Sequence, residues 1–193
     1  MLAAAGALLA LALPLGARGA DLAAGKAKAA LCAPCHGAMG ISEMTEIPSL
    51  AGQPDPFIQW QLVYFRSGTR KNPAMAPLIA SLGNEDIRNL GAYFASLTPP
   101  PAAPGNPEPA RAATGRALAA HLRCGSCHGA DYSGRDVAPR LAGQREEYLL
   151  KALRDFKSGV RTGGGVASMP EVVYPLADAE FQALAYFLAR YRK

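Results

Sequence analysis

Two short stretches of the chain combine cysteine and histidine in the same order. They are LCAPCHG at residues 31–37 and RCGSCHG at residues 123–129. In each, a histidine directly follows a Cys-x-x-Cys pair, the attachment signature of c-type haem, in which the thiols form thioethers and the imidazole binds the iron. The spacing therefore predicts two covalent haem c groups. The residues concerned are Cys32, Cys35, His36, Cys124, Cys127 and His128.

Two other chemistries also use paired cysteines. A zinc site needs four converging ligands, but 88 residues and a proline-rich stretch separate Cys35 from Cys124. A thioredoxin-like redox pair needs a βαβ pattern, which the sequence lacks. A structural disulfide within either pair would close a strained loop and leave the histidines unexplained. Haem attachment is favoured over all three alternatives.

Methionine is the candidate for the second axial ligand, because its thioether favours ferrous iron and raises the reduction potential. Met75 follows the first motif histidine by 39 residues, and Met169 follows the second by 41. Met39 lies too close to its histidine to reach the opposite face, and Met44 has no counterpart in the second half. The sequence predicts Met75 and Met169 as iron ligands, with a gap-filling core role as the alternative.

The chain contains an internal repeat. Residues 49–70 (SLAGQPDPFIQWQLVYFRSGTR) align without gaps with residues 140–161 (RLAGQREEYLLKALRDFKSGVR), and residues 82–97 resemble 176–191. Apolar residues recur at helical spacing in all of these segments, and no stretch alternates as a strand would. We expect an all-α tandem of two small domains, with Asn84 and Asp178 as helix N-caps.

Residues 98–111 (TPPPAAPGNPEPAR) divide the two halves. Proline at this density favours an extended, semi-rigid spacer. The expected domains are therefore 20–97 and 112–193. Each is small enough to have only a thin apolar core of its own, which a bound haem would enlarge.

Residues 1–19 resemble a signal peptide, with an apolar run at 2–15 that is broken by Pro14 and too short to span a bilayer comfortably. Cleavage after Gly19 would place small residues at the preferred positions. The alternative is a retained N-terminal anchor, so membrane association stays open. Either interpretation places the body of the protein outside the cytoplasm, and we expect the periplasm.

The motifs occur twice in one order: Cys-x-x-Cys-His-Gly, Pro-x-Leu-Ala-Gly-Gln, a helix ending in Phe-x-Ser-Gly-x-Arg, a methionine, and a helix with Tyr-Phe. This pattern resembles cytochrome c4, a di-haem family of class I c-type cytochromes. The resemblance implies two class I cytochrome c domains, each wrapped around one covalent haem with His/Met ligation. It also implies that Pro48 and Pro139 accept hydrogen bonds from the ligand histidines. Arg70 and Arg161 are candidate partners of the haem propionates.

The resemblance implies an electron carrier rather than an enzyme, since a six-coordinate iron offers no open position to a substrate. The expected donor is quinol–cytochrome c reductase or another redox protein, and the expected acceptor is a haem–copper oxidase or another redox protein. The alternative is the cytochrome subunit of an enzyme complex such as flavocytochrome c sulfide dehydrogenase. A di-haem peroxidase is less favoured, because one of its irons must open and this chain is short.

Charge is distributed unequally along the chain, whose formal net charge is +5. Residues 21–100 carry six basic and six acidic side chains, whereas residues 101–193 carry thirteen basic and nine acidic ones, a net charge of +4. This difference predicts electrostatic steering of a partner toward the second domain. The basic residues form no stripe with aromatic residues, so we expect no nucleic-acid partner. The third histidine, His121, is expected at the surface.

Overall fold

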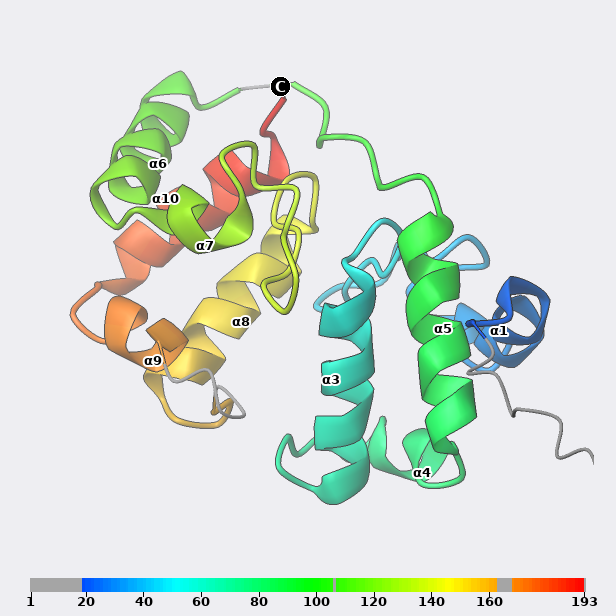
Figure 1. Ribbon diagram of the computed structural model, residues 1–193. Helices are drawn as coiled ribbons and strands as arrows, with labels where there is room; N and C mark the ends of the chain where they lie inside the picture. Colours follow the sequence, from blue (N-terminus) through cyan, green and yellow to red (C-terminus); the bar gives the residue numbers. More distant parts are fainter. Residues whose placement is uncertain (1–18, 106, 163–167, 193) are drawn as a thin grey trace, which may run out of the picture.

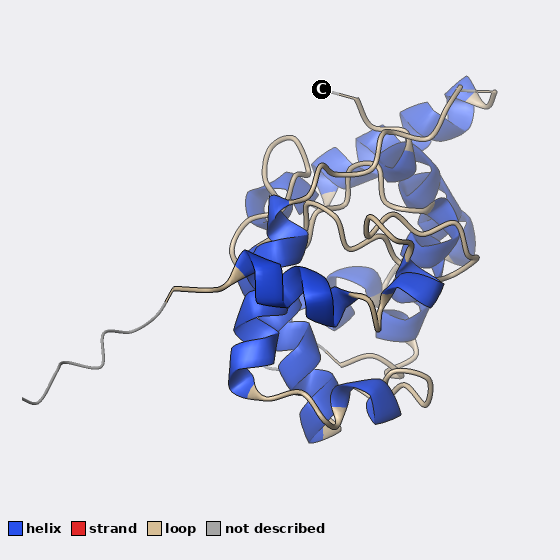
Figure 2. Cartoon of the chain, turned by 90° about the vertical axis from the view of Figure 1, so that its right-hand side faces the viewer, coloured by secondary structure: helices blue, strands red, loops and turns tan. Residues whose placement is uncertain are grey.

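The computed structural model describes residues 19–105, 107–162 and 168–192, which form two helical domains joined by an extended segment (Figure 1). The predicted signal peptide lies outside the described residues, apart from Gly19. The described part consists of helices and loops without strands (Figure 2), as the sequence predicts. The helices of the first domain are α1 (Leu22–Ala29), α2 (Ala33–His36), α3 (Asp55–Ser67), α4 (Ala76–Ile79) and α5 (Asn84–Ser96). Those of the second are α6 (Pro109–His121), α7 (Cys124–His128), α8 (Glu146–Lys157), α9 (Ser168–Val173) and α10 (Asp178–Ala189).

In each domain the first helix crosses the last helix at a glycine. α1 packs on α5, and α6 packs on α10. A Cβ atom on Gly25 would lie 2.2 Å from the carbonyl oxygen of Asn89, and one on Gly115 would lie 2.1 Å from that of Ala183. Both distances are far below van der Waals contact, so these crossings require glycine. The two domains thus share this helix pair, although α1 and α6 lie outside the segments that align in the sequence.

The middle helix of each domain covers the same last helix. α3 contacts α5 and α4, and α8 contacts α10 and α9. The apolar positions that predict α5 and α10 are buried, among them Ile87, Leu90 and Phe94 in α5 and Phe181 and Leu184 in α10. The cores are therefore assembled from the helix faces that the periodicity indicates. Within the three described ranges, no helix is long and apolar enough to cross a bilayer.

The starts of α5 and α10 differ by one residue from the sequence prediction. Asn84 and Asp178 are not N-caps but the first residues of their helices. Asp86 and Glu180, at the third helical position, accept hydrogen bonds from the backbone N–H groups of the N-cap residues Gly83 and Ala177 (2.9 and 2.7 Å). These carboxylates perform part of the capping function. The side chains of Asn84 and Asp178 are left to bind arginines of the middle helices.

The predicted linker, 98–111, is wrong at its end, because α6 begins at Pro109. Proline is tolerated in the first helical turn, where its missing N–H would have no partner. Pro109 belongs to a proline-rich stretch, which is why an extended chain was expected there. The last residues of the predicted linker therefore belong to the second domain.

The extended part of the linker lies against both domains rather than free in solvent. A Cβ atom on Gly52 would lie 2.6 Å from the Cβ of Pro99, and one on Gly143 would lie 2.8 Å from the carbonyl oxygen of Pro100. These glycines occupy equivalent positions in the two repeats. The linker thus passes over the same turn of each domain and requires glycine at both crossings.

Candidate haem sites

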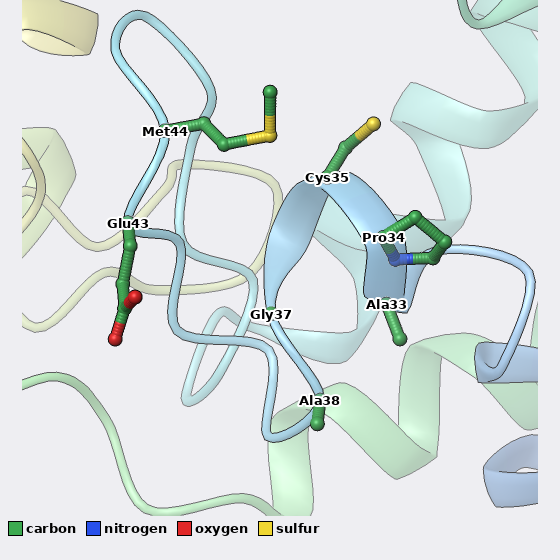
Figure 3. Close-up of a pocket in the computed structure, with 7 residues that line it drawn as sticks. All are labelled: Ala33, Pro34, Cys35, Gly37, Ala38, Glu43 and Met44. Carbon is green, nitrogen blue, oxygen red and sulfur yellow. The ribbon is translucent and has the colours of Figure 1, made fainter.

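Each Cys-x-x-Cys-His motif forms a single helical turn. Cys32 is the N-cap of α2, and the N–H of His36 donates to its carbonyl oxygen (2.9 Å). Cys35 and Met44 border a pocket of about 270 Å³, and the Cys35 sulfur projects away from the helix (Figure 3). No disulfide joins any of the four cysteines. The turn therefore brings two sulfur atoms and one imidazole close together in each domain.

Burial raises the pKa of the Cys32 and Cys124 thiols, and the neighbouring cysteine of each pair raises it further. A hydrogen bond to the backbone partly opposes this rise at Cys124. Both thiols are therefore protonated at pH 7 before any bond to a haem forms.

The two motif histidines have the same environment. His36 and His128 are 6% and 7% exposed. Their Nδ1 atoms lie 2.8 Å from the carbonyl oxygens of Pro48 and Pro139, respectively, the two prolines named by the resemblance. Burial lowers the pKa of both imidazoles, although the proline hydrogen bond opposes this. Each ring is thus neutral at pH 7 with Nδ1–H committed to a carbonyl, which leaves Nε2 for a metal.

The four methionines within the described residues fall into two groups. Met75 and Met169 are partly buried and pack against the same cores as Cys32 and Cys124, respectively. Met39 and Met44 are 62% and 48% exposed. Packing against the same core as the motif cysteines keeps Met75 and Met169 as the candidate iron ligands.

The start of α4 places Met75. The side chain of Asn72 accepts hydrogen bonds from the N–H groups of Ala74 and Met75 (2.9 and 3.1 Å). The corresponding approach to Met169 is the glycine-rich stretch 162–168, most of which lies outside the described residues.

Arg70 and Arg161 meet where the domains join. Arg70 donates to Gln61 Oε1 on α3 (2.6 Å) and to the Tyr148 hydroxyl on α8 (3.5 Å). Arg161 donates to the same two atoms (3.3 and 3.4 Å). The repeated arginines therefore form one cluster that spans both domains, although each belongs to a different repeat.

The arginine cluster has excess positive charge. No carboxylate in the described part of the chain forms an ion pair with either guanidinium. Burial lowers the pKa of Arg161 and Arg70 lowers it further, while Tyr148 and, more weakly, Asp155 oppose the shift. Burial alone would raise the pKa of Tyr148, but Arg161 and Arg70 outweigh it and lower the value to about 8. Two like charges held at a buried site favour an anion between them, and haem propionates fit this requirement.

A pair of glutamines also joins the domains, a role that the sequence alone does not indicate. Gln144 accepts from the N–H of Ser49 and donates to its carbonyl oxygen (both 2.9 Å). Gln53 does the same with Arg140 (2.9 and 3.0 Å). Both glutamines end the repeated Leu-Ala-Gly-Gln motif. A polar residue repeated inside an apolar motif is the signal that could have identified them.

Comparisons with known proteins agree with this arrangement. Residues 112–191 match the family model of cytochrome c. The chain is 33% identical to cytochrome c4 of Pseudomonas aeruginosa over 178 residues, which cover 87% of each chain. The chain belongs to the cytochrome c4 family. A crystal structure of cytochrome c4 from Pseudomonas stutzeri matches with a TM-score of 0.82 and 29% identity, covering 90% of this chain and all of that one.

A second kind of relative has similar identity. The thiosulfate dehydrogenase electron acceptor of Thiomonas intermedia is 34% identical over 181 residues, covering 88% of this chain and 82% of that protein. Membership of the cytochrome c4 family establishes the cofactors: the protein carries two haem c groups, one in each class I cytochrome c domain. The paired thiols, the neutral buried imidazoles and the unpaired arginine charge of this chain fit such groups.

Proposed function

We propose that this member of the cytochrome c4 family is a periplasmic electron carrier that delivers electrons toward a haem–copper terminal oxidase. The observation that carries the proposal is the fixed environment of His36 and His128. Each imidazole is buried and held by a backbone carbonyl, so its position need not change when the iron changes charge. Small rearrangement on reduction favours fast electron transfer between proteins.

We propose His36 with Met75, and His128 with Met169, as the axial ligands of the two irons. Cysteine thioethers in each motif would hold each macrocycle, and Arg70 and Arg161 would bind the propionates at the junction of the domains. When bound, each haem supplies one-electron redox chemistry. The residues of this chain orient the imidazoles, exclude water from them and place both groups in one molecule, which allows two electrons to be held.

A second candidate function is supported by the sulfur-enzyme relative. The Thiomonas protein is named as an electron acceptor of thiosulfate dehydrogenase, and its similarity to this chain equals that of the cytochromes c4. In this candidate function the chain accepts electrons from such an enzyme, as a subunit or a close partner. The flavocytochrome alternative is of the same class, a cytochrome paired with an oxidoreductase.

Stopped-flow spectroscopy of the exported holoprotein tests both candidates. The oxidised protein is mixed with quinol–cytochrome c reductase or with thiosulfate dehydrogenase plus substrate, and the reduced protein is mixed with a haem–copper oxidase. We expect reduction by the reductase and reoxidation of both haems by the oxidase. Reduction by thiosulfate dehydrogenase alone, with no oxidation by the oxidase, would replace the first candidate with the second. Mass of the purified protein must also exceed that of the processed chain by two haems.

A further inference from the structure

Each motif histidine is connected to the opposite domain through one peptide group. The Pro48–Ser49 peptide carries two contacts: its carbonyl oxygen lies 2.8 Å from His36 Nδ1, and its N–H donates to Gln144 Oε1 (2.9 Å). Gln144 belongs to the second domain. The histidine of the first domain, one planar peptide group and a glutamine of the second therefore form a continuous hydrogen-bonded chain.

The second domain has the reciprocal connection. The Pro139–Arg140 peptide accepts from His128 Nδ1 (2.8 Å) and donates its N–H to Gln53 Oε1 of the first domain (2.9 Å). The two chains of contacts are thus equivalent and run in opposite directions across the junction.

The geometry of each glutamine amide is held by two contacts with the opposite domain, and Gln144 Oε1 also accepts from the backbone N–H of Arg145 (3.0 Å). Gln53 and Gln144 are each 4% exposed. While Oε1 accepts from the backbone N–H, Nε2 donates to the carbonyl oxygen of the same residue, Ser49 or Arg140. Reversing an amide would place donor against donor and acceptor against acceptor. The oxygen is therefore the atom that faces the histidine-bound peptide in both cases.

Hydrogen bonds at the two ends of a peptide strengthen each other, because donation by the N–H increases the negative charge on the carbonyl oxygen. A more negative oxygen draws the Nδ1–H proton more strongly and makes the imidazole a more basic ligand. A more basic ligand stabilises ferric iron and lowers the reduction potential. Each glutamine is therefore positioned to lower the potential of the haem in the other domain.

We propose that Gln144 tunes the first haem and Gln53 tunes the second, so that the potential of each haem depends on its contact with the opposite domain. Both are positioning residues that act through a histidine. The inference rests on the histidine and methionine ligation proposed above. Docking of the two domains would then do more than hold the haems near one another, because it would also set how electrons are divided between them.

The test uses the full-length holoprotein and the variants Gln144→Met and Gln53→Met, which keep side-chain length and remove both polar atoms. Spectroelectrochemical titration gives the two potentials, and NMR of the imidazole Nδ1–H protons assigns them to domains. Gln144→Met is expected to raise the first potential and Gln53→Met the second. In a molecule that holds one electron, an equilibrium constant describes how that electron is divided between the haems. The two variants should change this constant in opposite directions, each by about threefold to tenfold. A tenfold change corresponds to a difference of about 59 mV between the potentials.

Two further variants separate tuning from loosening of the junction. Arg145 also crosses it, donating to the carbonyl oxygen of Ser42 (3.2 Å) without touching the histidine-bound peptide. Arg145→Met should leave the difference between the potentials near its wild-type value. Gln144→Glu keeps an acceptor for the Ser49 N–H. The reduction potential of the haem in the first domain should therefore stay at or below its wild-type value in this variant.

The inference would be overturned if neither glutamine variant changed a haem potential, or if both potentials rose together in both variants. It would also be overturned if Arg145→Met raised the potential of one haem as much as a glutamine variant does. If the methionine variants fail to fold, the glutamate variant decides, because a rise of the first potential in Gln144→Glu contradicts the mechanism. These measurements need bound haem but no partner protein. A wild-type protein that exchanges no electrons with either partner would contradict the proposed function and leave this inference intact.

Discussion

The two domains have the same internal framework but different surfaces around their cysteine–histidine motifs. At three aligned positions the first domain has apolar residues and the second has charged or polar ones. The pairs are Leu31 and Arg123, Pro34 and Ser126, and Met39 and Asp131. Leu31 and Met39 are 51% and 62% exposed, so neither is required by the core.

This difference separates what the haem requires from what a partner can recognise. The buried histidine, the proline carbonyl, the cross-domain glutamine and the glycine at the helix crossing occur in both domains. The surface beside each motif does not repeat. Apolar surface acts at short range through burial, whereas charge acts at long range and steers encounter. The domains are therefore equivalent as haem holders and different as docking surfaces.

The largest expected effect tests the equivalence of the haem sites. Met75→Ala should remove the second ligand of the first iron only, and Met169→Ala that of the second only. Each variant should bind carbon monoxide at one ferrous haem per chain, with a lower potential at that haem. Photolysis and rebinding spectroscopy measures the stoichiometry. A wild-type protein that binds carbon monoxide readily at both haems would contradict His/Met ligation and revive the peroxidase interpretation.

The helix crossings test the same equivalence through stability. Gly25→Ala and Gly115→Ala each place a methyl group against a backbone oxygen and should destabilise their own domain by about 3 kcal/mol. Denaturant unfolding of the holoprotein measures this. Trp60, the single tryptophan of the chain, reports on the first domain. Gly125→Ala is the control, since its nearest neighbour would lie 3.6 Å away and the first domain has Ala33 at the aligned position. A control as destabilised as Gly115→Ala would refute the crossing argument.

Features local in the sequence were the ones that could be predicted. The helical periodicity and the repeat led to the all-α tandem fold, because each depends on spacing within a short segment. The exposed position of His121 was also predicted correctly. The helix starts were displaced by one residue, because propensity favours Asn84 as a cap whereas the acid two residues later binds the backbone.

Contacts between the repeats could not be predicted in the same way. The repeat shows that Gln53 and Gln144 are equivalent, but not that each binds the other domain. Their partners depend on how two folded units dock, which no local pattern encodes. The meeting of Arg70 and Arg161 has the same origin, since one repeat supplies Gln61 and the other Tyr148.

The surface difference predicts a division of roles in docking. If charge on the second domain steers an acidic partner, Arg123→Glu should slow association about two- to fivefold at low salt and have little effect at high salt. If the first domain makes the short-range contact, Met39→Ser should slow electron transfer at all salt concentrations. Stopped-flow rates against ionic strength separate the two. If the rates of the two variants depended on ionic strength in the same way, the surfaces beside the two motifs would not have different roles in docking.

The smallest expected effect concerns how each middle helix is tied to the last helix. In the first domain Arg66 donates to the neutral side chain of Asn84 (2.7 Å), whereas in the second Arg154 donates to both oxygens of Asp178 (2.6 and 2.8 Å). Hydrogen bonds from Arg154 and then Gln182 lower the pKa of Asp178 to about 2. This pKa lies below the unfolded-state value of about 3.9, so the contribution to stability is present above pH 4 and is lost as the pH falls through 2.

Only the second domain should therefore show this acid-sensitive contribution, and exchanging the two residues should transfer it. Asp178→Asn should reduce the loss of stability of α10 between pH 4 and pH 2, and Asn84→Asp should create a similar loss in α5. Both side chains are solvent-exposed, so each shift will be small and will shrink further in high salt. Amide hydrogen exchange of the two helices, measured at matched pH in the same sample, compares the domains directly. Unchanged acid sensitivity of α10 in Asp178→Asn would mean that the ion pair adds nothing beyond the neutral hydrogen bond of the first domain.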